Sequence, residues 1–181
     1  ITGSLWRVYQ QGEREFCGIQ LPDNLHANQR LSGILVTPST KGVMRGLAGI
    51  PETDDTNLSR AQLTQHWRAF GFRSPDDIDH YEKLLKQGAE LIASHLAPLE
   101  LMLVDTKFEF GYANDSAGDE QLIYMDEVGT PDSSRIWDAV AYRSGRVLEN
   151  SKEEFRQALL RHVKDPQLLL DHTRFEERKQ F

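Results

Sequence analysis

The spacing of hydrophobic and polar positions changes several times along the chain, and each change predicts an element. Residues 1–20 have scattered apolar positions and indicate extended or mixed structure. Residues 21–58 are rich in Pro, Gly, Asn, Asp and Thr. A connection of that length is usually functional when it is ordered. Within it, the apolar run at residues 34–36 predicts a short strand.

Helical spacing begins at residue 59. Ser59 and Gln62 form a capping box, so a helix should run from there to about Phe70 and end at Gly71. Residues 74–77 (Ser-Pro-Asp-Asp) are typical of a second helix start. Apolar residues then recur at helical spacing, and this long helix should end before Pro98.

After Pro98 the pattern becomes strand-like. Residues 99–110 predict one strand and residues 121–127 a second, joined by a polar turn at residues 112–120, which favours an antiparallel hairpin. Residues 130–134 read as a turn leading into a short helical piece.

The last part of the chain is predicted to be helical. Ser151 and Glu154 form a second capping box, and the apolar residues Phe155, Leu159, Leu160 and Val163 are predicted to form the buried face of that helix. A final helix is expected from Asp165, followed by a charged, solvated tail at residues 174–179. The fold class is therefore α+β, an antiparallel sheet flanked by helices, with residues 1–150 as one domain portion and the helices of 151–181 packing on the same body.

Composition and charge narrow the class of protein. The chain has 181 residues, 39% of them hydrophobic, which excludes a disordered chain and allows a core of useful size. No apolar run approaches the length of a membrane span. The single Cys17 excludes an internal disulfide and fits a reducing compartment, the cytoplasm. A formal net charge of −7 argues against a general nucleic-acid binder, but not against an anionic small-molecule substrate.

The predicted hairpin carries candidate chemistry. Side chains alternate along a strand, so Asp105, Lys107 and Glu109 should share one face. The partner strand ends at Asp126 and Glu127, and a carboxylate from each strand makes a reasonable Mg²⁺ site. The alternative, which the pattern alone favours, is a solvated strand face with cross-strand ion pairs.

Three further clusters have polar donors suited to anions. Residues 130–135 combine hydroxyl groups with Arg135, whose guanidinium can bind a phosphate or carboxylate bidentately. Residues 2–4 and the two loop segments 37–41 and 53–57 are weaker candidates. For residues 130–135 the spacing alone favours an ordinary turn with a helix N-cap, and ordinary turn or loop chemistry also accounts for the other segments. The six His and one Cys show no metal-binding spacing, and no Gly-rich phosphate-binding motif is present.

Taken in order, these clusters resemble the SAICAR synthetase (phosphoribosylaminoimidazole-succinocarboxamide synthase) family of purine biosynthesis. The matching segments are residues 2–5 (TGSL), 37–41 (TPSTK), 104–111 (VDTKFEFG) and 125–137 (MDEVGTPDSSRIW). The third and fourth are specific for the family. The resemblance spans nearly the whole chain and implies the central and carboxy-terminal part of an ATP-grasp-like fold, with a glycine-rich nucleotide lobe preceding Ile1 that is absent from these residues.

The resemblance implies a ligase that uses ATP and Mg²⁺. Such an enzyme activates the carboxylate of carboxyaminoimidazole ribonucleotide (CAIR) as an acyl phosphate, which the amine of L-aspartate attacks. The products are the succinocarboxamide ribonucleotide SAICAR, ADP and phosphate. The expected partners are these small molecules alone, without nucleic acid or membrane, and the protein is expected to be a monomer or a homodimer.

The resemblance also implies roles for individual residues. Glu109 and Asp126 match acids that bind Mg²⁺, and Lys107 matches a lysine near the substrate carboxylate and phosphates, so these three form the catalytic set. The implied substrate-binding residues fall into two groups. Those for the ribonucleotide are Ser4, Asp132, Ser134 and Arg135, with Arg135 for its phosphate, and those in the loop on the aspartate side are Thr40, Lys41, Asp55 and Asn57.

One loop departs from the family pattern. Many members have His-Asp-Glu-Asn where this chain has Asp54, Asp55, Thr56 and Asn57, so only the second and fourth positions align. Two other functions stay open: a non-catalytic binding protein of the same fold, and a different phosphotransferase with the same pair of acidic strands. The retained acidic and basic residues disfavour the first, and the ribonucleotide motifs disfavour the second.

Overall fold

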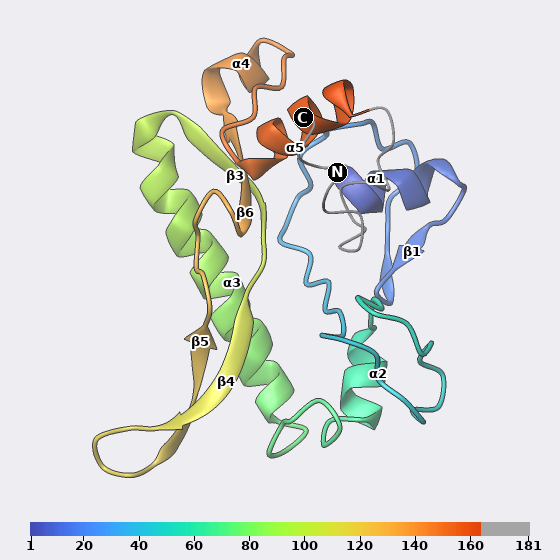
Figure 1. Ribbon diagram of the computed structural model, residues 1–181, viewed down its shortest axis with the longest axis vertical. Helices are drawn as coiled ribbons and strands as arrows, with labels where there is room; N and C mark the ends of the chain where they lie inside the picture. Colours follow the sequence, from blue (N-terminus) through green and yellow to red (C-terminus); the bar gives the residue numbers. More distant parts are fainter. Residues whose placement is uncertain (164–181) are drawn as a thin grey trace. The chain divides into compact units, whose positions relative to one another are not determined.

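Two compact units make up the chain, Ile1–Lys86 and Gln87–Phe181. The computed structural model describes residues 1–163 (Figure 1). The boundary between the units falls inside a single long helix, α3 (Asp77–Leu96). Each unit is therefore described by itself.

The first unit is built from short elements around two apolar clusters. Its elements before α3 are α1 (Gly3–Gln10), the antiparallel pair β1 (Glu15–Phe16) and β2 (Ile19–Gln20), and α2 (Arg60–Gln65). One cluster surrounds Tyr9, which lies on α1 and stacks on Trp6 at a ring-centroid distance of 5.6 Å. The other is centred on Leu58 and Ile78. The expected strand at residues 34–36 does not form.

The capping box that begins α2 is confirmed. The Ser59 hydroxyl accepts the Gln62 N–H at 3.2 Å, and the Ser59 N–H donates to the Gln62 side chain at 2.8 Å. The helix ends at Gln65, earlier than the predicted Phe70, and residues 66–71 form turns instead. These turns place Trp67 and Phe70 against the Leu58–Ile78 cluster, so tertiary packing outweighs local helix propensity here.

The long helix α3 confirms the second helix prediction. The Ser74 hydroxyl accepts the N–H of Asp77, the first residue of α3, at 3.3 Å. The helix ends at Leu96, before Pro98, and a 3₁₀ turn, η1 (Ala97–Leu99), follows it. The chain then reverses at Glu100, whose φ of 57° is left-handed.

The second unit contains two strand pairs, which confirms an α+β fold with antiparallel strands. The predicted hairpin is β4 (Glu109–Asn114) with β5 (Glu120–Met125). The prediction of a single strand over residues 99–110 is wrong, because the strand is interrupted at Lys107 and Phe108. The part before the break is β3 (Leu101–Thr106), which pairs with β6 (Ser134–Asp138).

The segment after the turn at residues 130–134 also differs from its prediction. It is strand β6 rather than a short helical piece, and the short helix α4 (Ala139–Arg143) begins only after it. Ser134, Ile136 and Trp137 of β6 are all buried. A short apolar run of this kind does not distinguish a strand from a buried helical turn by its spacing.

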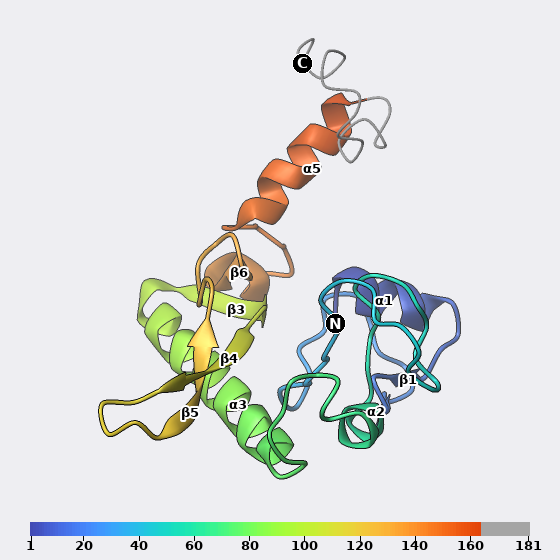
Figure 2. The ribbon, with the colours of Figure 1, turned by 60° about the horizontal axis from the view of Figure 1, so that its bottom comes forward.

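The β4–β5 hairpin lies alongside α3, as Figures 1 and 2 both show. The rings of Phe108, Phe110 and Tyr124 contact one another, with centroids 5.0 to 6.3 Å apart. Gly88 of α3 lies close against two of these rings. A Cβ built on Gly88 would lie 2.9 Å from the Tyr124 hydroxyl and 3.1 Å from the Phe108 ring.

The last described helix, α5 (Lys152–His162), differs from its prediction in two respects. None of the residues of the helix itself is buried, and Phe155 is 66% exposed. Of the four residues predicted to form a buried face, only Val163, directly after the helix, is buried. The Ser151 hydroxyl donates to Glu149 instead of capping the helix, so the second capping box is absent as well. Figure 2 shows α5 extending away from the strands of its unit.

The predicted final helix from Asp165 and the charged tail lie outside the described residues. Within residues 1–163, no helix is both long and apolar enough to cross a membrane.

Replacing Gly88 by alanine tests the packing between α3 and the hairpin. Alanine normally stabilises a helix relative to glycine. Here we expect Gly88→Ala to lower the free energy of unfolding by about 1–3 kcal/mol, because the new methyl group overlaps Tyr124 and Phe108. Urea unfolding measures the change. Tyr124→Phe removes the hydroxyl oxygen nearest to the new methyl group, so it should partly offset the destabilisation caused by Gly88→Ala. If Gly88→Ala by itself stabilised the protein, this packing would be contradicted.

Candidate functional site

The pairing of β3 with β6 brings predicted site residues together. Asp105 lies opposite Arg135, and the Arg135 Nη1 donates to the Asp105 carboxylate at 2.5 Å. The next pair is Thr106 with Ser134, whose hydroxyls lie 2.8 Å apart. The Lys107 N–H then donates to the Ser133 carbonyl at 2.9 Å, so the two chains stay together past the end of the strands.

The break between β3 and β4 holds Lys107 next to Glu109. The Lys107 Nζ lies 2.8 Å from the Glu109 carboxylate. Only 18% of the Glu109 side chain is exposed, whereas 69% of the Lys107 side chain is. Lys107 and Glu109 thus stay together as expected, while Asp105, predicted to share their strand face, pairs with Arg135.

The hairpin register relates Glu109 to Asp126. Glu109 lies opposite Met125, and Asp126 follows Met125 directly. Asp126 has a φ of 61°, so it has left the strand and adopts a left-handed conformation that Asp tolerates better than most residues. One carboxylate at the end of each paired strand fits Mg²⁺, which takes one or two protein carboxylates and completes its shell with phosphate oxygens and water. Within residues 1–163, no group of three or more His, Cys, Asp or Glu side chains is arranged to hold a metal by itself.

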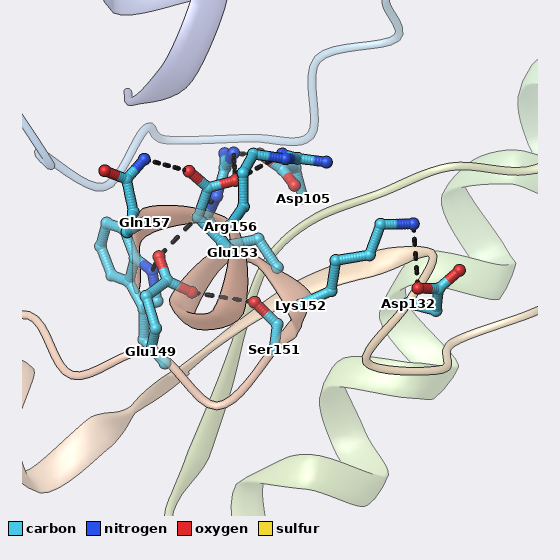
Figure 3. Close-up of polar contacts among 10 residues, drawn as sticks. Asp105, Asp132, Glu149, Ser151, Lys152, Glu153, Arg156 and Gln157 are labelled. Carbon is cyan, nitrogen blue, oxygen red and sulfur yellow. Dashed lines mark hydrogen bonds and ion pairs between the residues drawn. The ribbon is translucent and has the colours of Figure 1, made fainter. Parts of the chain in front are cut away.

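The turn at residues 130–134 is tied down by its own hydroxyl groups and by α5. The Thr130 hydroxyl accepts the Ser133 N–H at 3.2 Å and donates to Glu127 at 2.7 Å. Asp132 forms an ion pair with Lys152 of α5 at 2.9 Å (Figure 3). The same lysine donates its backbone N–H to the Pro131 carbonyl at 3.0 Å. α5 therefore helps to fix a turn that the sequence assigns to substrate binding.

Arg135 has two more acidic neighbours besides Asp105. Its Nε lies 3.8 Å from Glu149, and its Nη2 lies 3.7 Å from Glu153. The side chain of Arg135 is 18% exposed, and those of Glu149 and Glu153 are each 17% exposed. Sequence reasoning missed both glutamates, since neither lies in a family motif and acidic residues are frequent in this part of the chain.

Glu153 has three partners in this network, Arg135, Arg156 and Gln157, and Figure 3 labels the last two. Burial by itself raises the pKa of Glu153. Hydrogen bonds from Gln157 and Arg156, both at 2.6 Å, and the charges of Arg156 and Arg135 outweigh that effect. The pKa of Glu153 is therefore lower than usual, and the carboxylate stays charged beside Arg135.

The remaining predicted site residues lie in the first unit. Ser4 is exposed in the first turn of α1, and Lys41 and Asp55 are exposed in the long loop. Thr40 is only 3% exposed, and its hydroxyl accepts the Thr56 N–H at 3.0 Å. Asn57 forms an isolated antiparallel bridge with Ser39. The two loop segments that the sequence singled out are thus joined by backbone pairing.

Asp54 stabilises the same loop. Its carboxylate accepts the Gly42 N–H at 2.8 Å and the Asp55 N–H at 2.9 Å. Asp54 and Thr56 are the two positions that depart from the family pattern. Both make local hydrogen bonds that hold the loop, so the departure does not leave the loop unsupported.

These elements define an α+β protein whose antiparallel strands carry paired acidic and basic side chains. Comparison with known proteins identifies the family. The family model for SAICAR synthetase matches residues 1–168, and the chain belongs to this family.

Curated relatives agree with the family match. The chain is 59% identical to a phosphoribosylaminoimidazole-succinocarboxamide synthase of Shewanella amazonensis, in a match that covers 99% of the chain. It is 60% identical to a synthase of the same name from Aeromonas salmonicida, in a match that covers 98% of the chain. The matched regions are 49% and 48% of those proteins, so the chain spans about half the length of the curated relatives it matches.

A solved structure supports the fold. A SAICAR synthase of Saccharomyces cerevisiae complexed with SAICAR is 30% identical to the chain, with a TM-score of 0.64. The match covers 96% of this chain and 53% of the yeast chain.

The lowered pKa of Glu153 predicts a pH-dependent contribution to stability. Because the pKa in the folded state lies below its unfolded value, the contribution is present above the unfolded pKa of about 4.3 and is lost as the pH falls through the folded value. We expect Glu153→Gln to cost about 0.5 kcal/mol at pH 7 and progressively less as the pH falls below the unfolded pKa. Thermal unfolding between pH 3 and pH 7 measures this. Glu154→Gln on the same helical turn is the matched control, and an equal loss at all pH values would exclude the electrostatic explanation.

Proposed function

We propose that this protein takes part in the ATP-dependent ligation of L-aspartate to CAIR, which yields SAICAR, ADP and phosphate. The observation that carries the proposal is the 59–60% identity, over nearly the whole chain, to curated relatives named for this reaction. The acidic and basic residues that the proposal needs are retained at every matching position of the two specific motifs. We place the reaction in the cytoplasm, with the protein as a monomer or a homodimer.

The reaction explains why the site needs both charges. A carboxylate is a poor electrophile, so ATP must convert it into an acyl phosphate before an amine can attack. Negative charge develops on the transferring phosphoryl group, and cationic groups stabilise it. Water must be excluded, because it would hydrolyse the acyl phosphate.

Glu109 and Asp126 would hold Mg²⁺, which supplies positive charge against the phosphate oxygens. The register supports this assignment, because Asp126 follows the residue that pairs with Glu109. Lys107 would meet the substrate carboxylate and phosphates. Its ion pair with Glu109 supports a common location for the metal and the reacting groups.

Four residues would bind the ribonucleotide. Arg135 would bind its phosphate, with Ser4, Asp132 and Ser134 as further contacts. The guanidinium of Arg135 donates one hydrogen bond to Asp105, and its Nε and Nη2 edge has only the longer contacts to Glu149 and Glu153. A phosphate can therefore still be bound by that edge.

The loop joined by the Ser39–Asn57 bridge would bind L-aspartate. Lys41 supplies a positive charge for one of the two carboxylates of the substrate, and Asp55 and Asn57 offer acceptors for its amine. Thr40, which is buried, would support this loop by accepting the Thr56 N–H with its hydroxyl oxygen.

A non-catalytic relative of the same fold is the alternative function. Such a protein would bind the nucleotide without converting it, and the assay below distinguishes this alternative from the ligase. Because the chain spans about half the length of its curated relatives, assays use the longest natural form of the protein.

ADP release should require every substrate. We expect ADP to form only when ATP, Mg²⁺, CAIR and L-aspartate are all supplied, because the activated carboxylate forms on CAIR and aspartate consumes it. A coupled ADP assay that omits each component in turn measures this. ADP formation that is indifferent to aspartate would exclude the ligase, and binding without turnover would favour the non-catalytic alternative.

Loss of either proposed metal carboxylate should abolish turnover. We expect Glu109→Gln and Asp126→Asn each to lower kcat by a factor of at least about 100, since the phosphoryl transfer loses charge stabilisation. Circular dichroism and thermal unfolding verify that the fold persists. Asp119→Asn, in the exposed turn of the same hairpin, is the matched control and should leave kcat unchanged. Near-normal turnover by either site variant at limiting Mg²⁺ would contradict the metal assignment.

A further inference from the structure

The three acidic neighbours of Arg135 do not contact it in the same way. Asp105 accepts a direct hydrogen bond from Nη1 at 2.5 Å. Glu149 and Glu153 lie 3.8 and 3.7 Å from Nε and Nη2, which is beyond hydrogen-bond distance. These two carboxylates attract the guanidinium without occupying its donors.

Glu149 is fixed by contacts that do not involve Arg135. One of its carboxylate oxygens accepts the Trp137 indole N–H at 2.6 Å, and the other accepts the Ser151 hydroxyl at 2.9 Å (Figure 3). Trp137 is only 3% exposed, so the indole is a rigid support.

The backbone fixes Glu149 as well. Glu149 and Trp137 form an isolated antiparallel bridge. On either side of it, the Asp138 N–H donates to the Leu148 carbonyl at 3.0 Å, and the Asn150 N–H donates to the Ile136 carbonyl at 2.7 Å. The short segment 148–150 thus lines the edge of β6, the strand that carries Arg135.

Glu153 is a different kind of neighbour. Its carboxylate is already hydrogen-bonded to Arg156 and Gln157 on its own helix, both at 2.6 Å. Its charge is therefore shared with another cation, and its position depends on two long side chains. Glu149 is the acidic neighbour whose orientation is set by a buried ring and by paired backbone.

We infer that Glu149 is a positioning residue for ribonucleotide binding: its carboxylate, held by Trp137 and Ser151, directs the Nε and Nη2 edge of Arg135 so that these donors meet the substrate phosphate. The inference rests on the proposed function, in which Arg135 binds that phosphate. Glu149 is not a catalytic residue, because it acts through Arg135.

Two physical effects of Glu149 on an anion have opposite signs, which makes the inference testable. A fixed negative charge near the binding position repels a phosphate, so its removal should strengthen binding if repulsion were the whole effect. Orientation of the guanidinium favours binding, so loss of Glu149 should weaken it. The direction of the change in the KM for CAIR therefore distinguishes the two effects.

Glu149→Gln is the decisive variant. Its amide oxygen can still accept the Trp137 N–H, and its amide nitrogen can still donate to Ser151, so the local packing is kept while the charge is lost. We expect the KM for CAIR to rise about tenfold, with kcat and the KM values for ATP and L-aspartate nearly unchanged. The kinetics use the longest natural form of the protein, and circular dichroism checks each variant. If Glu149→Gln does not fold, Glu149→Asp, which withdraws the charge by one methylene, replaces it.

The control and the double variant separate positioning from general damage. Glu154→Gln, exposed on the first turn of α5, should leave the KM for CAIR unchanged. In an Arg135→Ala background, Glu149→Gln should cause no further rise, because its effect passes through the guanidinium. The inference would be overturned by an additive effect of Glu149→Gln in the Arg135→Ala background. It would also be overturned if Glu149→Gln by itself left the KM for CAIR unchanged or lowered it. If Arg135→Ala by itself leaves the KM for CAIR unchanged, the proposed phosphate role of Arg135 is wrong instead.

Discussion

A largely buried guanidinium needs carboxylates around it, because an unpaired charge withdrawn from water costs several kcal/mol. In the second unit this requirement falls on Arg135, whose side chain is 18% exposed. Its partners come from three places along the chain: Asp105 from β3, Glu149 from the segment before α5, and Glu153 from α5 itself. Neutralising this one cation therefore connects both strands of one sheet with the last described helix.

The break at Lys107 and Phe108 is the second constraint on the site. One continuous strand would place Asp105, Lys107 and Glu109 in a row on a single face. Because the strand is interrupted there, β3 pairs with β6 and β4 pairs with β5. Asp105 then meets Arg135, while Glu109 lies at the open end of the hairpin with Asp126 one residue beyond its partner. This interruption therefore places Arg135 in the β3–β6 sheet and Glu109 in the β4–β5 hairpin. Only the two linking residues separate β3 from β4 along the chain.

Local sequence signals predicted the elements whose causes are local. The capping box at Ser59 and the acidic start of α3 act within one turn, and the hairpin around residues 109–125 has its turn residues in sequence. The partners of β3 could not be predicted, because β6 lies about 30 residues away and the alternation of side chains continues through the break. The exposed face of α5 and the role of Glu149 depend on tertiary contacts that no spacing encodes. The candidate metal acids were predictable as residues, but their relation to each other required the register.

The carboxylates that let Arg135 be buried also oppose the binding of an anion to it. The distances show how both conditions can be met. Only Asp105 makes a direct hydrogen bond, and it uses Nη1, which is not part of the Nε and Nη2 edge. At 3.7 and 3.8 Å, Glu149 and Glu153 give up no hydrogen bond when Nε and Nη2 turn to another acceptor, and they keep most of their attraction for the cation. An anion bound to that edge would gain two charge-assisted hydrogen bonds and break none within the protein, although it would meet the repulsion of the two glutamates. The net effect depends on how firmly the guanidinium is oriented. Asp105 fixes its Nη1 corner, and of the two acids near the Nε and Nη2 edge, Glu149 is the one held by a buried ring and paired backbone.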